Sequence, residues 1–266
     1  MKSISPELVT GQVPVSLEIA LAVVGLFVGG LMNAVADRIP PLDPEYDGPF
    51  IAEQNRPLKW WEFLPFLSMI GARQAPRMKI KNGWWRYPAL ELGTALGFWL
   101  SASRFDDNVP VMIAASLFSA SLVALAFIDF ETKYLPFKLV WPTGIAALAF
   151  APFWPDLEWW QPLAGAAAGF MVFYPIYLLG IRLNRPLMGG GDAYLAAAMG
   201  AMLGIQMLFL GLYIGVVIGG LAATVVLFVR MAGKGQQVIA YGPYLSMGGL
   251  VALFFGRSII DWIVGA

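Results

Sequence analysis

The chain has 266 residues, of which 59% are hydrophobic and 13% are charged, and its mean hydropathy is +0.69. This composition excludes an ordinary soluble domain and indicates a polytopic membrane protein, while the net charge of zero gives no sign of nucleic-acid binding. The sequence has no histidine and no cysteine, which excludes Ser/His and Cys/His catalysis and leaves paired carboxylates as the main catalytic chemistry.

Eight apolar segments are long enough, or nearly so, to cross a bilayer about 30 Å thick. We therefore expect an all-α, polytopic membrane protein with about eight transmembrane helices. The first segment is expected to be retained, because Glu18 lies at its start and no small-residue cleavage site follows it. Only a tight turn near Gly204 separates the short sixth segment from the seventh. In chain order the segments are 17–36, 88–103, 109–129, 136–154, 162–181, 192–204, 206–229 and 244–264.

The distribution of basic residues predicts which side of the membrane each loop faces. The polar stretch 38–86 and the loops after the third, fifth and seventh segments hold 14 of the 17 basic residues. Positively charged loops stay in the cytoplasm, so we expect this stretch inside and both termini outside. Three parts follow: residues 1–37 with the first span, 38–87 as a cytoplasmic loop domain, and 88–266 as the transmembrane core.

Two aspartates, Asp129 and Asp192, each lie at the border of a long apolar segment. A carboxylate at the edge of a hydrocarbon layer is costly, so function is the first hypothesis for it. The third segment runs inward and ends at Asp129, whereas the sixth starts from the inside at Asp192. The topology therefore predicts both carboxylates at the cytoplasmic edge and at similar depth. Such a pair shares a proton, so that one member can activate water while the other supports the developing oxyanion.

Each aspartate also has a purely structural interpretation. Asp129 can be a polar residue that ends a helix at headgroup level, and Asp192 can be a helix N-cap. The three preceding glycines, Gly189, Gly190 and Gly191, weaken the second interpretation, because ordering them costs backbone entropy. Such a run is useful where another backbone passes within contact distance, and we predict that these glycines bind an extended peptide substrate.

Six short elements occur in the order typical of the type IV prepilin peptidases, and the chain resembles this family over most of its length. The stretch Ile128–Pro136 resembles the family's I-D-x-E-x-x-x-L-P, and Gly189–Asp192 matches its G-x-G-D. The resemblance implies a GxGD-type intramembrane aspartic protease with Asp129 and Asp192 as the catalytic residues. The other four elements are Gly29–Pro40, Trp61–Ser68, Arg86–Thr94 and Tyr241–Leu245.

The resemblance also implies substrates and a location. The substrates would be type IV prepilins or type II secretion pseudopilins, whose leader peptides would be removed at the cytoplasmic edge of the bacterial inner membrane. Proteolysis would need no cofactor, and the surroundings would be membrane lipid. Many members also methylate the new N-terminus with S-adenosylmethionine, although the sequence has no glycine-rich nucleotide loop of the Rossmann type.

The sequence departs from the family pattern at two places. Members usually have Lys two residues after the G-x-G-D aspartate, where this chain has Tyr194, so its pH optimum is expected to differ. Most members also carry two C-x-x-C pairs that can hold zinc. This chain cannot form that tetrathiolate site, and no zinc is expected, because the corresponding residues are Ile51, Gln54, Pro76 and Lys79.

Two other classes of protein remain as alternatives. A proton-coupled transporter could use Asp129 and Asp192 as proton carriers, but such proteins often show internal repeats and midplane sites, and neither is evident here. A scaffold for pilus or secretion assembly would need neither aspartate. Glu91, in an otherwise apolar segment, is a candidate for a supporting role in the site, and an interhelical hydrogen bond is the alternative for it.

Overall fold

The computed structural model describes residues 15–37, 64–66, 85–185, 188–231 and 240–265. These residues form seven α-helices and one short 3-10 helix, which confirms the all-α prediction. Most of the predicted loop domain over 38–87 lies outside the described residues. The helices are α1 (Val15–Ala36), α3 (Arg86–Arg104), α4 (Val109–Thr132), α5 (Phe137–Phe150), the 3-10 helix η5 (Ala151–Phe153), α6 (Gln161–Arg182), α7 (Gly190–Met231) and α8 (Gly242–Val264).

Five of these helices are long and apolar enough to cross a membrane, as expected for a polytopic membrane protein: α1, α4, α6, α7 and α8. Two predicted spans, 88–103 and 136–154, form helices but are not among the five. The first of them, α3, includes the buried polar residues Arg86, Glu91 and Thr94, which lower its hydropathy. The second, α5, has 14 residues and so is about 21 Å long, shorter than a bilayer core.

The predicted turn near Gly204 divides α7 into two halves that lie side by side. Gly204 has φ 71° and ψ 177°, a backbone conformation that is open to glycine because it lacks a Cβ. In a straight helix, Met199 and Gly211 would be about 18 Å apart. Here the Met199 side chain contacts Gly249, and Gly211 contacts the adjacent Gly248. Both contacts are possible only because the chain reverses its direction at Gly204.

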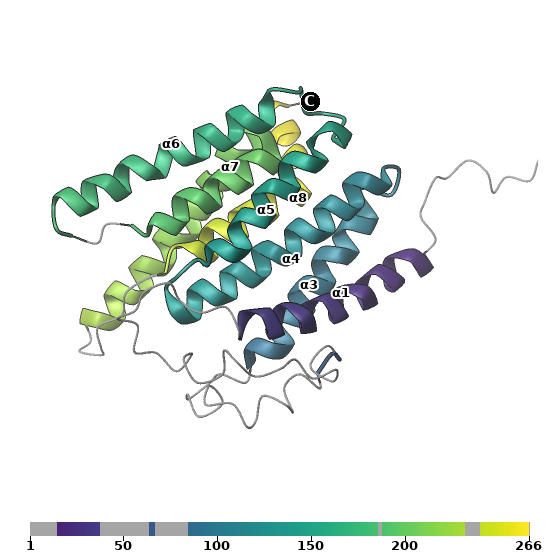
Figure 1. Ribbon diagram of the computed structural model, residues 1–266, viewed down its shortest axis with the longest axis horizontal. Helices are drawn as coiled ribbons and strands as arrows, with labels where there is room; N and C mark the ends of the chain where they lie inside the picture. Colours follow the sequence, from purple (N-terminus) through teal and green to yellow (C-terminus); the bar gives the residue numbers. More distant parts are fainter. Residues whose placement is uncertain (1–14, 38–63, 67–84, 186–187, 232–239, 266) are drawn as a thin grey trace, which may run out of the picture.

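The helices lie roughly along one direction, as Figure 1 shows, and pack as a continuous series. Helix α1 packs on α3, α3 on α4, α4 on α8, α8 on α7, and α7 on α6, while α5 lies against α7 and α4. The centre of the bundle is formed by fully buried side chains of α4, α7 and α8, namely Leu122, Leu125, Leu195, Met199 and Leu245. Between α6 and the first half of α7 the backbones touch directly, as is common where small residues meet in lipid.

The contact between Gly165 and Gly200 generates the first prediction. A Cβ on Gly200 would lie 2.8 Å from the backbone nitrogen of Ala166 and closer still to the Gly165 carbonyl. Because backbone atoms cannot move aside cheaply, Gly200→Ala should destabilise the protein by about 1–3 kcal/mol. Gly220→Ala is the matched control, since a Cβ there meets nothing within 4 Å. Thermal unfolding in detergent should show a lower midpoint for Gly200→Ala only, and equal midpoints would contradict this packing.

Candidate active site

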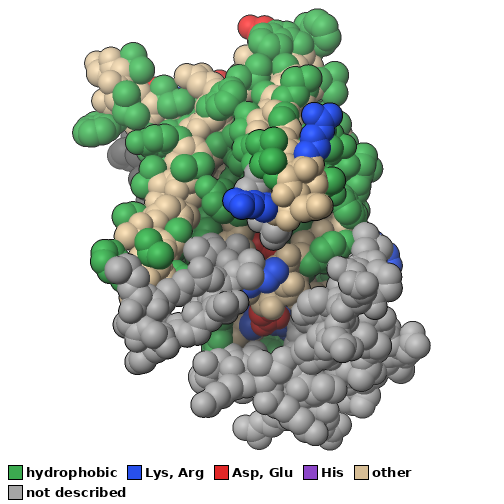
Figure 2. Space-filling model, turned by 90° about the vertical axis from the view of Figure 1, so that its left-hand side faces the viewer, with side chains coloured by type: hydrophobic (Ala, Val, Ile, Leu, Met, Phe, Trp, Pro, Cys, Tyr) green, Lys and Arg blue, Asp and Glu red, His purple; other side chains and the backbone are tan. Residues whose placement is uncertain are grey.

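The two aspartates meet at one end of the bundle. Asp129 lies in the last turn of α4 and Asp192 in the first turn of α7, and each is 5% exposed. Their carboxylates are close enough to interact electrostatically. We call this end, where α1 and α4 finish and α7 and α8 begin, the carboxylate end. Figure 2 shows that hydrophobic side chains cover much of what is described on this face, and that acidic and basic side chains gather near its centre.

Local sequence explains why a helix ends beside Asp129. Lys133 takes the left-handed conformation with φ 59°, and its N–H donates to the carbonyl oxygen of Asp129 at 2.8 Å. This is a common helix C-cap, and Pro136 then prevents the helix from continuing. Burial lowers the pKa of the Lys133 ammonium, and the nearby Asp129 carboxylate partly offsets this effect. A cation therefore lies within electrostatic range of one member of the pair.

Asp192 is not the N-cap that the structural interpretation of the sequence suggested. It is the third residue of α7, and its N–H donates to the carbonyl oxygen of Gly189 at 3.2 Å. An acidic residue in the first turn still complements the helix dipole. Three glycines, Gly189, Gly190 and Gly191, come directly before it.

Two of those glycines are packed against other parts of the same chain. A Cβ on Gly190 would lie 3.2 Å from the ring of Tyr177, and a Cβ on Gly191 would lie 2.8 Å from Cβ of Leu135. Glycine at these positions therefore allows close approach of α6 and of the segment that precedes α5. Gly189 differs, because its Cβ would face the Asp192 carboxylate at 3.3 Å. Substrate binding at Gly189, Gly190 and Gly191 stays a prediction.

The start of α8 contacts the Asp129 carboxylate, and sequence reasoning gave this segment no role. The N–H of Gly242 donates to Oδ2 of Asp129 at 2.9 Å. Burial and, to a lesser degree, the Asp192 carboxylate raise the pKa of the Tyr241 phenol, so this side chain lies near the second aspartate. The only available signal was the resemblance of Tyr241–Leu245 to a family element, which does not reveal a backbone contact.

A buried arginine joins three helices at the carboxylate end. The guanidinium of Arg86, at the start of α3, is fully buried. It contacts Asp37 after α1 at 2.5 Å and Glu131 of α4 at 3.3 Å, and the Tyr87 hydroxyl donates to Asp37 at 2.9 Å. Because Glu131 lies two residues beyond Asp129, these ion pairs hold the helix end that carries the first aspartate. The sequence showed these charges but not their pairing.

Glu91 has the structural role that was the alternative in the sequence analysis. It is fully buried, and its two oxygens accept hydrogen bonds from the Asn33 side chain at 3.4 Å and from the Phe66 backbone N–H at 2.8 Å. The first bond links α1 to α3, and the second fixes the described part of the segment between them. Glu91 therefore supports the packing around the site from a distance.

The described part of the chain offers little that could hold a metal or a cofactor. None of them form a group of three or more acidic side chains arranged to bind a metal ion. Two cavities lie beside α5, with volumes of about 130 and 320 Å³. Neither is lined by a charged side chain, so neither fits a ligand with ribose hydroxyls and an amino-acid group.

Comparison with known proteins gives consistent matches. The sequence profile of the type IV leader peptidase family matches residues 116–224, a range that includes both Asp129 and Asp192. A prepilin leader peptidase/N-methyltransferase of Pseudomonas putida is 30% identical, over 89% of this chain and 90% of its own. Relatives with the same name in Xanthomonas campestris and Bacillus subtilis are 28% and 29% identical, over 92% and 96% of their own chains. No solved structure gives a significant match.

The ion pairs of Arg86 generate the second prediction. Arg86→Met leaves Asp37 and Glu131 without their shared cation, and breaking a buried pair in this way costs about 3–5 kcal/mol. Both carboxylates are partly exposed, so we expect the lower part of that range.

Arg257→Met is the matched control, because Arg257 pairs with Asp156 on the surface, where ion pairs contribute about 0–1 kcal/mol. Thermal unfolding of the two variants in detergent measures the difference. An equally small shift for both would show that Arg86 does not hold the three helices together.

Proposed function

Because the chain belongs to the type IV leader peptidase family, we propose that it is a membrane aspartic endopeptidase that cleaves the leader peptide of type IV prepilins or type II secretion pseudopilins. The observation that carries the proposal is the meeting of Asp129 and Asp192 at the carboxylate end of an apolar bundle. Two carboxylates in a site that excludes most water are the catalytic groups of an aspartic protease. No histidine or cysteine is present to support another hydrolytic mechanism.

The proposed reaction uses the pair as a unit. Ionising both of two neighbouring carboxylates is unfavourable in free energy because the negative charges repel, so the pair shares one proton. The ionised member takes a proton from a water molecule, whose oxygen attacks the scissile carbonyl carbon. The protonated member hydrogen-bonds to the developing oxyanion, and the proton gained by the first is then delivered to the leaving amine as the C–N bond breaks. The Gly242 N–H keeps Asp129 in position throughout, since a backbone donor needs no reorganisation.

We further propose the orientation predicted from the basic loops. Counting the two halves of α7 separately, with α3 and α5 as additional crossings, the chain crosses the bacterial inner membrane eight times and has its carboxylate end toward the cytoplasm. This orientation places the scissile bond at the inner edge of the membrane. A basic leader would remain in the cytoplasm while the apolar helix that follows it stays in lipid.

A second activity is suggested by the names of the relatives, which include N-methyltransferase. The methyl donor would be S-adenosylmethionine, which supplies an electrophilic methyl group to the new N-terminal amine. Neither of the two cavities beside α5 has a charged side chain to hold this donor. Transfer of a labelled methyl group from the donor to a cleaved prepilin tests this activity separately from proteolysis.

The catalytic roles generate the third prediction. Asp129→Asn and Asp192→Asn remove the acid–base function while keeping side-chain size, so each should lower the rate of leader removal from a purified prepilin by about 10²–10⁴-fold or more. Asp261→Asn, at an exposed aspartate near the end of α8, is the control and should leave the rate unchanged. Normal cleavage by either of the first two variants would refute the proposed pair.

The contact between Gly242 and Asp129 generates the fourth prediction. A Cβ on Gly242 would lie 2.7 Å from Oδ2 and 2.9 Å from Cγ of Asp129. Gly242→Ala should therefore displace the carboxylate and reduce kcat by about 10²-fold, because small errors of position are costly in catalysis.

The same variant should unfold near the temperature of the native protein, since the clash falls on one side chain. Gly220→Ala again serves as the control in the cleavage assay. If Gly242→Ala cleaved prepilin at the native rate, the geometry given for Asp129 would be wrong.

A further inference from the structure

The basic side chain of Lys133 lies at the end of the helix that carries the first aspartate, and the proposed reaction does not use it. Its N–H donates to the carbonyl oxygen of Asp129 at 2.8 Å, which places residue 133 directly after the last turn of α4. The side chain folds back on that turn, because Nζ donates to the carbonyl oxygen of Phe130 at 3.1 Å and lies 5.4 Å from the centre of its ring. The ammonium is therefore held beside the turn that contains Asp129.

The two aspartates lie at opposite ends of their helices, and these ends do not favour a negative charge equally. Asp192 lies in the first turn of α7, where the helix dipole stabilises an anion. Asp129 lies in the last turn of α4, where the dipole and the carbonyl oxygens without helical partners oppose an anion. The dipoles alone would therefore place the negative charge on Asp192 and the shared proton on Asp129.

Two groups offset this imbalance at Asp129. The N–H of Gly242 donates to Oδ2 of Asp129 at 2.9 Å, and the ammonium of Lys133 interacts electrostatically with the same carboxylate. Asp192 also has a backbone contact, at Gly189. The backbone at the start of a neighbouring segment thus acts on both aspartates, whereas the Lys133 cation acts on Asp129.

The other titratable groups near the carboxylate end in the described part of the chain bring no comparable cation to the pair. The Tyr241 phenol near Asp192 has a raised pKa because of burial, so it stays protonated and neutral. The buried Arg86 is paired with two acidic side chains, as described above. Three further basic side chains are exposed at the start of α5 and the end of α6, namely Lys138, Arg182 and Arg185.

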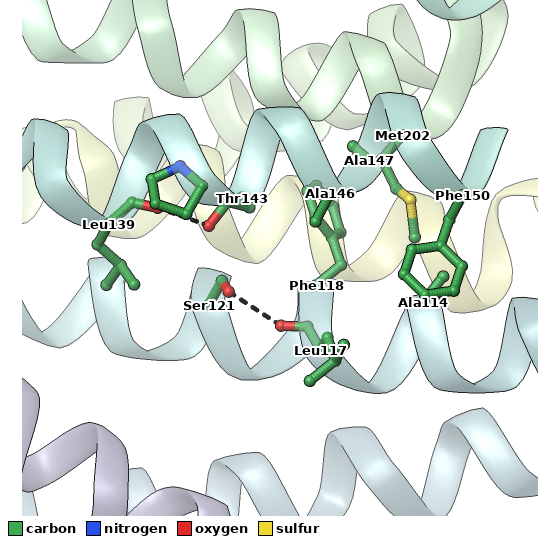
Figure 3. Close-up of a pocket in the computed structure, with 11 residues that line it drawn as sticks. Ala114, Leu117, Phe118, Ser121, Leu139, Thr143, Ala146, Ala147, Phe150 and Met202 are labelled. Carbon is green, nitrogen blue, oxygen red and sulfur yellow. Dashed lines mark hydrogen bonds between the residues drawn. The ribbon is translucent and has the colours of Figure 1, made fainter.

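The side of α4 that faces α5 also adds no charge. Figure 3 shows the cavity of about 130 Å³ on this side, which is lined by Thr143 and Phe150 of α5 and by Phe118 and Ser121 of α4, among others. No charged side chain lines it, and the Ser121 hydroxyl donates to the carbonyl oxygen of Leu117 in its own helix at 2.9 Å. The polar atoms of this cavity are therefore not directed at the pair.

We propose that Lys133 is a positioning residue of the catalytic pair, whose ammonium offsets the dipole at the end of α4 and so allows Asp129 to carry the negative charge. The inference rests on the proposed function, because it takes hydrolysis by Asp129 and Asp192 as given. Asp129 is then the ionised member that takes a proton from water. Asp192 holds the shared proton and hydrogen-bonds to the developing oxyanion.

Substitutions of Lys133 separate this electrostatic role from a structural role in the helix cap. Residue 133 has φ 59°, a left-handed conformation that asparagine adopts more readily than lysine. Lys133→Asn therefore removes the charge without weakening the cap, and its unfolding midpoint in detergent should be no lower than that of the native protein. Lys133→Arg keeps the charge and Lys133→Glu reverses it. Lys138→Asn is the matched control, because Lys138 is exposed at the start of α5.

The test is the pH profile of kcat/KM for leader removal from a purified prepilin. A cation beside the pair favours its ionised form and so lowers the pH at which activity appears, which means that removing the cation moves the acidic limb to higher pH. Because Lys133 is exposed, we expect a displacement of about 0.2–0.7 pH unit for Lys133→Asn. The displacement should be larger for Lys133→Glu, and Lys133→Arg and Lys138→Asn should keep the native limb.

Salt gives a second measure of the same charge. Raising the ionic strength from about 0.05 to about 0.5 M screens the interaction between exposed charges, so the acidic limb of the native protein should move to higher pH. The limb of Lys133→Asn should move less, because this variant has no ammonium left to screen.

Coincident acidic limbs for the native protein, Lys133→Asn and Lys133→Glu would overturn the inference. A change of KM at every pH with no displacement of the limb would also overturn it, since the ammonium would then act on the leader peptide. If the native protein removes no leader at any pH, the proposed function itself fails.

Discussion

Moving a carboxylate from water into an apolar interior costs on the order of several kcal/mol unless neighbouring groups compensate it. This chain places two carboxylates, Asp129 and Asp192, among helices that are apolar along most of their length. Among the described residues, the compensation comes from the backbone at Gly242 for Asp129 and at Gly189 for Asp192, from the cation of Lys133 within electrostatic range, and from the pair itself. In the described part of the chain, the buried cation Arg86 is already neutralised by Asp37 and Glu131. The proposed reaction depends on this arrangement, because a pair of neighbouring carboxylates that keeps one proton can exchange it with a reactant.

The rest of the carboxylate end positions this pair without neutralising it. Arg86 joins the ends of α1 and α4 to the start of α3, and Glu91 joins α1, α3 and the short segment around Phe66 by hydrogen bonds. These contacts use side chains and backbone atoms of α1, α3 and α4 and of the Phe66 segment to hold the polar side of the bundle.

The sequence was sufficient to predict the helices, the reversal at Gly204 and the aspartates at a common end, because apolar runs, glycine and membrane-edge charges follow simple physical rules. It was not sufficient to predict the contact of Gly242 with Asp129, which joins residues 113 positions apart through a backbone atom. Nor did it decide between the two interpretations of Glu91. Both depend on which helix faces meet, and helices that are apolar on nearly all sides carry little information about their neighbours.

The central claim is that the side chains of residues 129 and 192 meet, and the absence of native cysteines allows a direct measurement. The double variant Asp129→Cys/Asp192→Cys is treated with a short cross-linker that joins two thiols, and the product is identified by mass spectrometry. Efficient intramolecular cross-linking is predicted, with none for Asp129→Cys/Asp261→Cys, because residue 261 lies about 28 Å along α8 from Gly242. A yield no higher than that of the control pair would contradict the account.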